Sequence, residues 1–131
     1  MALIYSGDAG IAQARASETG NMVEIAYAIP REGTLMWIDL MAIPHDAKNT
    51  EAAYRFIDYI LRPKVIAEVT NTVYFANANR AAAAHVATDI LSDPGIYPDA
   101  ETRARLFPDL DVDARMLRQC TRAWTAVKSG Q

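Results

Sequence analysis

The sequence predicts an α/β fold from two kinds of segment and from its composition. Three short apolar segments, at residues 2–6, 22–29 and 35–43, are rich in β-branched and bulky side chains and predict strands. Longer segments place apolar residues at three- and four-residue spacing, which predicts amphipathic helices. Hydrophobic residues make up 51% of the 131 residues, enough for the packed core of one small domain.

The N-terminal third alternates between predicted strands and one helix. Asp8 follows the first strand and suits the N-cap of a helix over residues 8–18. A Gly–Asn pair at residues 20–21 breaks this helix before the second strand, which Pro30 closes. The third strand, at residues 35–43, is followed by a proline and a loop.

The remainder is predicted to be mostly helical. Asn49 can cap a helix over residues 50–61 that has an apolar stripe along one side. Pro63 can open the next helix, which runs to about Val69. An irregular segment at residues 71–79 separates these from helices predicted at residues 81–91, 98–106 and 113–128. Along the last helix, Met116, Cys120, Ala123, Trp124 and Val127 share one face.

The charge and the residue types exclude several functional classes. A net charge of −3, a pI of about 5.3 and scattered basic residues disfavour a nucleic-acid or anionic-membrane partner. The sequence has no phosphate-binding loop, no metal-ligand spacing and no nucleophile motif, so we expect no enzyme and no cofactor. His45 and His85 are expected at the surface, and the single cysteine, Cys120, is expected to be a small buried hydrophobe.

Asp39 is the one carboxylate within the third predicted strand. Burying a carboxylate is costly unless a positive or hydrogen-bonding group meets it. Since side chains alternate along a strand, Trp37 and Asp39 would lie on the same face. An acid beside an indole suits an organic ammonium ion, because the ring adds a cation–π attraction of about 2 kcal/mol when desolvated. A hydrogen bond to backbone near the strand end is the alternative role for Asp39, and the alternation leaves both roles open.

Two further groups of residues can likewise have either a structural or a ligand-binding role. Tyr5 and Asp8, three residues apart, form a second aromatic–acid pair, although Asp8 as an N-cap would need no ligand. Tyr74 and Phe75 lie in the irregular segment and either pack in the core or contact a ligand. Two acids with several aromatic rings would suit a slender molecule that has more than one amine.

Several specific strings of residues are distributed along the whole chain. They are YSGD at residues 5–8, AIPREG at 28–33, ID at 38–39 with AIP at 42–44, FANAN at 75–79, DPGIYP at 93–98 and TRAWTAVKSG at 121–130. Together they resemble the putrescine/spermidine-binding proteins of bacterial ABC-type polyamine importers, most closely the putrescine-binding branch. The chain also begins inside a predicted strand with no leader before it, so we expect it to be the C-terminal part of a longer protein.

The resemblance implies a two-lobed periplasmic-binding-protein fold of type II, which closes like a Venus flytrap. By analogy, residues 1–31 belong to the second lobe, residues 32–82 cross into the first lobe, and residues 83–131 return to the second. The resemblance also implies a periplasmic location, a polyamine ligand in the cleft between the lobes, and a membrane ABC permease as partner.

The same resemblance implies roles for five side chains. Asp39 is similar to the main amine-binding carboxylate of the family, and Trp37 to its aromatic partner. Asp8 is similar to a second amine-binding acid, whereas Tyr5 stands where the family often has tryptophan, and Phe75 where tyrosine is common. The alternative is a non-binding interaction module that self-associates, since unpaired strand edges recruit other chains.

Overall fold

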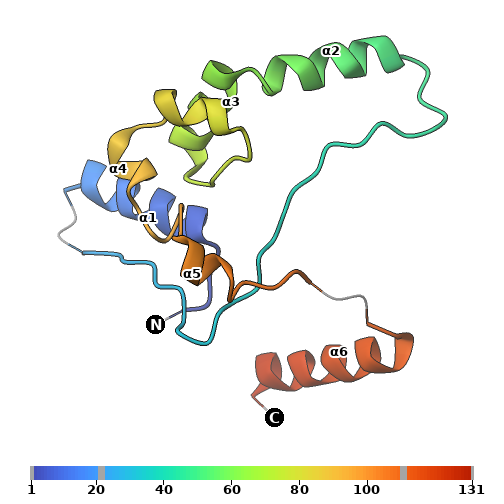
Figure 1. The fold of residues 1–131 in the computed structure, drawn as a ribbon. Coiled ribbons are helices and arrows are strands. Elements are labelled where there is room, and N and C mark those ends of the chain that lie inside the picture. The colour runs from blue at the N-terminus through green and yellow to red at the C-terminus, as the bar shows by residue number, and fades with distance from the viewer. Residues whose placement is uncertain (1, 21–22, 110–111, 131) are drawn as a thin grey trace.

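The structure is a computed structural model that describes residues 2–20, 23–109 and 112–130. Figure 1 shows α1, α3 and α4 gathered together, whereas α2 and α6 project away from them. Within the described residues, seven helical segments follow in order: α1 Ser6–Glu18, α2 Thr50–Ile60, α3 Pro63–Val73, the 3₁₀ helix η1 Arg80–His85, α4 Thr88–Leu91, α5 Ala100–Arg103 and α6 Ala114–Ser129. None of these helices combines the length and apolarity that crossing a membrane requires.

Three helix starts are those that local signals predict. The Asn49 side chain caps α2 by accepting a hydrogen bond from the Ala52 N–H over 3.4 Å. Pro63 is the first residue of α3, where its missing N–H costs nothing because that N–H would have no helical partner. The Asp113 carboxylate caps α6 by accepting from the Met116 N–H over 2.7 Å. The predicted roles of Asn49 and Pro63 are confirmed, and the helix predicted from residue 113 begins one residue later, at Ala114.

The N-terminal helix begins earlier than predicted. Tyr5 is the N-cap residue of α1, and Asp8 lies inside its first turn. The prediction that Asp8 is the N-cap is therefore wrong. A carboxylate in the first turn still stabilises the helix, because the N-terminal end has a positive dipole. The predicted end at Glu18 is confirmed, while Asn21 and Met22, at the predicted break and strand start, lie outside the described residues.

The helix predicted at residues 81–91 is divided in two. The backbone is extended at Val86 and Ala87, between η1 and α4. The side chain of Asn71 occupies this break, because its amide donates to the His85 carbonyl over 3.3 Å and accepts from the Ala87 N–H over 2.9 Å. The neighbouring predictions needed smaller corrections: α3 continues past Val69 to Val73, and the helix at residues 98–106 is reduced to α5.

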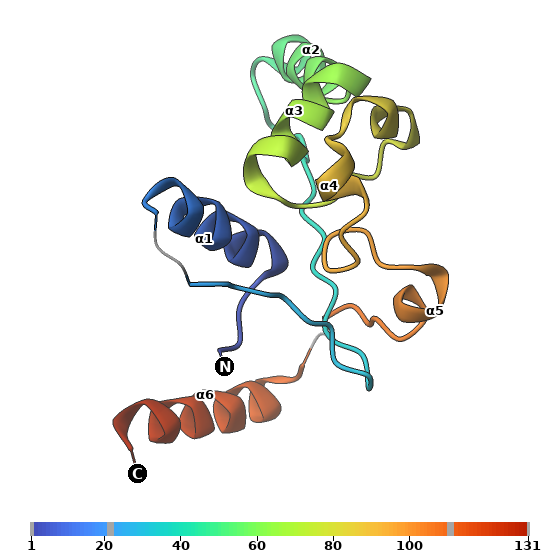
Figure 2. The same cartoon turned by 90° about the vertical axis from the view of Figure 1, so that its left-hand side faces the viewer.

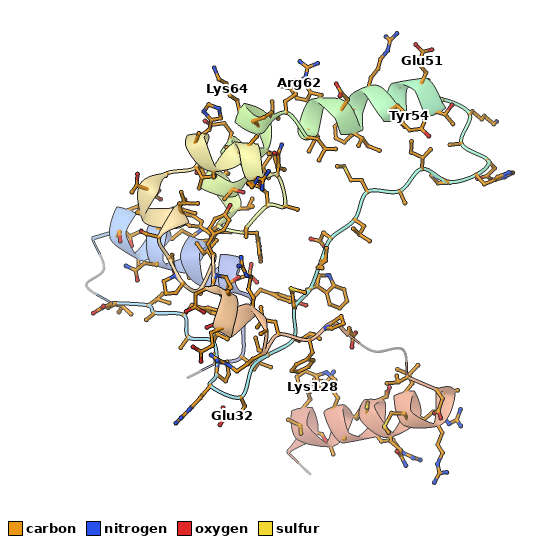
Figure 3. All side chains as sticks on the ribbon, viewed as in Figure 1. Glu32, Glu51, Tyr54, Arg62, Lys64 and Lys128 are labelled. Atoms are coloured by element: carbon orange, nitrogen blue, oxygen red, sulfur yellow. The ribbon has the colours of Figure 1, made fainter. Side chains whose placement is uncertain are left out.

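A small core forms where α3 meets η1 and α4. Its centre is made of small and branched apolar side chains, and Thr70 of α3 is buried among them with 1% of its surface exposed. The core residues are Ala67, Ala82, Val86, Ile90 and Ile96, with Ile66, Tyr74 and Tyr97 packed against them. By contrast, α2 buries no residue, and Figure 3 shows Glu51 and Tyr54 projecting from different sides of that helix.

The three predicted strands do not form among the described residues, so the α/β class is not confirmed by this structure. The described residues contain one isolated parallel bridge, between Leu35 and Phe107, and no strand. A strand is completed by the N–H and C=O groups of a neighbour. Among the described residues, the segments at residues 2–5, 23–29 and 37–43 meet no such neighbouring strand, so their backbones follow no regular structure.

One of these segments nevertheless has the burial pattern of a strand. Ile25, Tyr27 and Ile29 are half-buried, and the residues between them are exposed. This is the two-residue alternation of a strand with one face against the protein. The Gln13 side chain of α1 accepts a hydrogen bond from the Ile25 N–H over 2.6 Å, in place of a ladder partner.

Gly33 marks a second point where the chain is fixed without a sheet. Its φ of +94° is unfavourable for any residue with a Cβ, and a Cβ there would overlap the Arg105 carbonyl oxygen and lie 2.9 Å from the carbonyl carbon. This close approach allows two backbone hydrogen bonds: Met36 N–H donates to Phe107 over 2.7 Å, and Phe107 N–H donates to Thr34 over 3.2 Å. The segment before Trp37 is thus anchored to the segment after α5.

We expect Gly33→Ala to release this anchor. The positive φ and the overlap with the Arg105 backbone together cost about 2–4 kcal/mol, more than two backbone hydrogen bonds return. Hydrogen exchange at the Met36 amide should become at least about tenfold faster. Gly20→Ala is the matched control, because Gly20 has a φ of +66° but nothing within 4 Å of an added Cβ. Equal effects of the two changes on the Met36 amide would contradict the overlap.

Much apolar surface lies outside the small core. The chain exposes 10947 Å², whereas a self-contained globular protein of 14.4 kDa exposes about 6,800 Å². The prediction that Cys120 is buried is wrong, because no residue of α6 is buried and Cys120 is exposed. His45 and His85 are exposed, as predicted. Self-association of the chain stays a prediction.

Candidate functional site

Trp37 and Asp39 form a direct pair, although the strand that was expected to align them is absent. The indole Nε1–H of Trp37 donates a hydrogen bond to Asp39 Oδ1 over 3.1 Å. The Trp37 side chain is 56% exposed, and Asp39 is exposed as well. The bond fixes the edge of the indole against the carboxylate and leaves the other carboxylate oxygen and the faces of the ring open to a ligand. The backbone hydrogen bond considered as the alternative role for Asp39 is not formed with any residue that the structure describes.

The first turn of α1 brings together the second group of predicted site residues. Gly7 is buried directly beneath the ring of Phe75, since a Cβ at Gly7 would lie 2.6 Å from Phe75 Cζ and closer still to Cε2. The Phe75 ring therefore packs against the first turn of α1, the turn that also contains Asp8. Asp8 is exposed and makes no hydrogen bond or ion pair with any residue that the structure describes. An exposed carboxylate without a partner among the described residues can accept an ammonium group.

The turn that presents Phe75 is held by hydrogen bonds from polar side chains. Tyr74 ends α3 in the left-handed conformation, with a φ of +59°. The Asn77 side-chain amide donates to the buried Thr70 hydroxyl over 2.9 Å and to the Tyr97 hydroxyl over 3.4 Å. Its carbonyl oxygen accepts from the Asn79 N–H over 3.0 Å. The amides of the FANAN string thus hold the turn, and Phe75 points out of it with 39% of its surface exposed.

Sequence reasoning missed Gly7 and Asn77 as residues that position Phe75. The predicted helix began at Asp8, so Gly7 gave no local signal. A glycine inside a helix costs about 1 kcal/mol relative to alanine and indicates a close approach by another group, and within the predicted helix that signal stood at Gly10. Gly10, one turn later on α1, meets Tyr74 in the same way, with an added Cβ 2.7 Å from Tyr74 Cβ. No comparable local signal identified Asn77, since its partner Tyr97 is 20 residues away.

The five predicted residues therefore form two groups. No hydrogen bond or ion pair among the described residues joins Trp37 and Asp39 to the group at the start of α1. Asp8 also borders an open groove of about 650 Å³ between α1 and the segment at residues 23–25. The groove is lined by Asp8, Ile11, Ala12, Arg15, Ala16, Thr19, Val23 and Ile25, and so includes none of the other four predicted residues. Across residues 2–20, 23–109 and 112–130, no three His, Cys, Asp or Glu side chains converge as ligands for a metal ion.

We expect Gly7→Ala to displace the Phe75 ring from α1, because overpacking of this kind typically costs about 1–3 kcal/mol. In a complete binding protein that contains this chain, diamine affinity should fall by about tenfold, corresponding to about 1.4 kcal/mol. A double-mutant cycle with Phe75→Ala, measured by calorimetry, isolates the contact. In the Phe75→Ala background, the added methyl group of Gly7→Ala should cost little. A full additional loss there would show that Gly7 acts through some other neighbour.

Comparisons with known proteins agree on one family. The family model described as bacterial extracellular solute-binding protein matches residues 1–97. The whole chain is 44% identical to the putrescine-binding periplasmic protein PotF of Escherichia coli (strain K12) and 44% identical to the putrescine-binding periplasmic protein SpuD of Pseudomonas aeruginosa (strain UCBPP-PA14). The spermidine/putrescine-binding periplasmic protein of Escherichia coli is 34% identical over 102 residues.

The chain spans 35% of the length of the Escherichia coli putrescine-binding relative and 36% of the Pseudomonas one. The resemblance to putrescine/spermidine-binding proteins that the sequence strings predict is confirmed by these matches. The relatives are binding proteins by name, and the family implies a periplasmic-binding-protein fold for the complete molecule. The chain belongs to the family of bacterial extracellular solute-binding proteins.

Proposed function

We propose that this chain is part of the solute-binding subunit of an ABC-type polyamine importer, and that its ligand is a diamine such as putrescine. The observation that supports this best is the pairing of Trp37 with Asp39: an exposed carboxylate is held against an exposed indole. It occurs in a chain that is 44% identical to two proteins named for putrescine binding. An alkyl diamine needs negative charge at its ends and an apolar wall along its methylenes, and this pair offers both.

In the proposal, each end of the diamine has its own acid. Asp39 accepts one ammonium group, and the face of Trp37 lies against the adjoining methylenes. Asp8 accepts the other ammonium group, with Tyr5 and Phe75 as the aromatic wall beside it. The position of Phe75 against Gly7 supports this arrangement, because it places a ring within the same helical turn as Asp8.

Tyr5 and Asp8 would face Trp37, Asp39 and Phe75 across a cleft between two lobes. Residues 1–31 and 83–131 belong to one lobe, and residues 32–82 cross into the other. Closure of the lobes around the ligand removes water from the charged pairs and so strengthens them. The closed form would deliver the diamine to a membrane permease from the periplasm, the compartment in the names of the relatives.

A chimera tests the proposal. In it, the matched 131 residues of the Escherichia coli relative are replaced by this chain, which covers 35% of that protein. We expect the chimera to bind putrescine with a micromolar or lower Kd in calorimetry and to gain thermal stability from the ligand. A chimera that unfolds cooperatively on heating, but binds no putrescine, spermidine, cadaverine or agmatine, would contradict a polyamine site in this chain.

The second candidate function is an interaction module that binds no solute. The exposed surface of 10947 Å² favours it, because that surface includes large apolar side chains such as Leu40 and Trp124, which call for a protein partner. The same chimera separates the two candidates. Folding without polyamine binding supports the interaction module, and ligand binding excludes it.

A further inference from the structure

Thr70 is the one polar side chain that is buried among residues 2–20, 23–109 and 112–130, with 1% of its surface exposed. It lies on α3 among the apolar core residues, where a hydroxyl group costs free energy unless it is hydrogen-bonded. A valine would have nearly the same shape and would avoid that cost. The proposed site gives Thr70 no role, so the presence of its hydroxyl group needs another explanation.

The hydroxyl group of Thr70 is bonded differently from those of three other helical threonines. The hydroxyls of Thr72, Thr121 and Thr125 donate to the carbonyl four residues earlier, over 2.8, 2.8 and 2.9 Å. By contrast, the Thr70 hydroxyl accepts a hydrogen bond from Asn77 Nδ2 over 2.9 Å, and this is its only hydrogen bond with a described residue. The bond therefore connects the core to the turn that follows α3.

Thr70 holds both ends of that turn. Its carbonyl accepts from the Tyr74 N–H over 2.9 Å at one end, and its hydroxyl accepts from Asn77 at the other. Tyr74 has a φ of +59°, a conformation that a residue other than glycine keeps only where the surrounding contacts hold it. Phe75 lies between these two attachments, and Figures 1 and 2 show, in two perpendicular views, that the turn after α3 lies beside α1.

The side chain of Asn77 uses its whole hydrogen-bonding capacity in this turn. Its amide nitrogen also donates to the Tyr97 hydroxyl over 3.4 Å, and its carbonyl oxygen accepts from the Asn79 N–H over 3.0 Å. The bond to Thr70 is the shortest of the three, and it is the one made to a buried group. Removal of the Thr70 hydroxyl would therefore release Asn77 from the core and allow the Phe75 segment to move.

We propose that Thr70 is a positioning residue for ligand binding: its buried hydroxyl orients Asn77 and thereby fixes the Phe75 ring against α1. The inference rests on the proposed function, since Phe75 is one of the side chains proposed to contact the diamine. Gly7 is the surface that receives the ring, because an added Cβ there would lie 2.6 Å from Phe75 Cζ. A ring that is already fixed loses little conformational freedom when the ligand binds, and this favours affinity.

Two variants of Thr70 in the chimera separate positioning from core stability. Thr70→Val keeps the shape of the core and removes the hydroxyl, so we expect an unchanged or higher Tm and putrescine binding weakened about tenfold in calorimetry. Thr70→Ser keeps the hydroxyl and removes a buried methyl group, so we expect a Tm lower by about 2–4 °C and a Kd within about threefold of the parent. If the variant with the lower Tm is also the weaker binder, or if Thr70→Val binds as the parent does, the proposal is overturned.

Thr72→Val is the matched control for the loss of the hydroxyl. It makes the same exchange two residues later on α3, at an exposed side chain that bonds the Glu68 carbonyl, and should change the putrescine Kd by less than about twofold. In a Phe75→Ala chimera, Thr70→Val should have no further effect on the Kd, because the ring through which it acts is absent. A full loss of affinity in either case would contradict a role of Thr70 that acts through Asn77 and Phe75.

A measurement without ligand separates this inference from the proposed function. In NMR spectra of the 131-residue chain, the Phe75 ring should displace the chemical shifts of the Gly7 Hα protons, and Phe75→Ala gives their undisplaced values. We expect Thr70→Val to move these shifts most of the way to the undisplaced values, and Thr70→Ser and Thr72→Val to leave them as in the parent. Parent shifts in Thr70→Val would overturn the proposal even where the chimera binds putrescine. A chimera that binds no polyamine contradicts the proposed function, and the Gly7 shifts then still decide whether Thr70 fixes the ring.

Discussion

Asp39→Asn in the chimera is expected to weaken putrescine binding by at least about 100-fold. The change keeps the shape of the side chain and the acceptor for the Trp37 indole, but it removes the negative charge. Leaving one member of a buried charge pair without its partner costs about 3–5 kcal/mol, and each 1.4 kcal/mol is about a tenfold change in Kd. Isothermal titration calorimetry of the variant and the parent chimera measures the difference.

Asp46→Asn is the matched control for this change. Asp46 is an exposed acid in the turn that follows the same segment, and it has no role in the proposed site. Its neutralisation should alter the affinity by less than about threefold, because an exposed charge in water contributes under about 1 kcal/mol. An Asp39→Asn chimera that binds as tightly as the Asp46→Asn chimera would remove Asp39 from the site.

The 131-residue chain by itself is expected to bind putrescine at least about 100-fold more weakly than the chimera. Trp37, Asp39 and Asp8 are exposed to water, and no described contact joins their two groups. An ammonium and a carboxylate 4 Å apart gain about 1 kcal/mol in water and about 4 kcal/mol in the partly desolvated environment of a protein. A diamine with two such pairs therefore loses most of its binding energy when the cleft is open.

Titration followed by the NMR signals of the Trp37 indole and of putrescine would extend this measurement to millimolar ligand. The chimera is the positive control, and Asp39→Asn in the isolated chain reports any weak binding at the proposed position. Micromolar binding by the isolated chain would mean that these residues already form a complete site without an opposing wall.

Helix starts were predictable because the signals that fix them are local. Asn49 and Asp113 each reach an N–H three residues ahead, and Pro63 has its backbone angle set by its own ring. The start of α1 was mispredicted for a reason that is not local. Phe75, 68 residues away from Gly7 in the sequence, packs on the first turn, so the helix extends back to Ser6.

The other mispredicted helices and strands also depend on contacts between residues that are far apart in the sequence. The helix expected at residues 81–91 is interrupted because Asn71 bonds backbone groups of His85 and Ala87. The expected strands had the right alternation, which survives at Ile25, Tyr27 and Ile29, but an apolar pattern cannot supply the neighbour that a ladder requires.

For the candidate site, the local pairing of Trp37 with Asp39 was predictable, and the spatial relation between the two groups of residues was not. Alternation along the segment placed Trp37 beside Asp39, and the hydrogen bond between them is present even without a sheet. The proximity of Phe75 to the start of α1 depends on how α3 packs and on the turn that Asn77 holds. These contacts are set by tertiary structure, so the sequence pattern could not reveal them.

The Trp37–Asp39 hydrogen bond has a consequence for selectivity against zwitterions. The indole has a single N–H, and that N–H is already donated to the carboxylate. Among the five proposed ligand-binding side chains, the Tyr5 hydroxyl is then the remaining donor, and the two carboxylates, when ionised, can only accept. A diamine needs no donor, whereas the amino acid with the same carbon chain and an added α-carboxylate would bring a negative charge beside Asp8 or Asp39. The site would discriminate by repulsion, turning away amino acids while it admits the amines formed from them by decarboxylation.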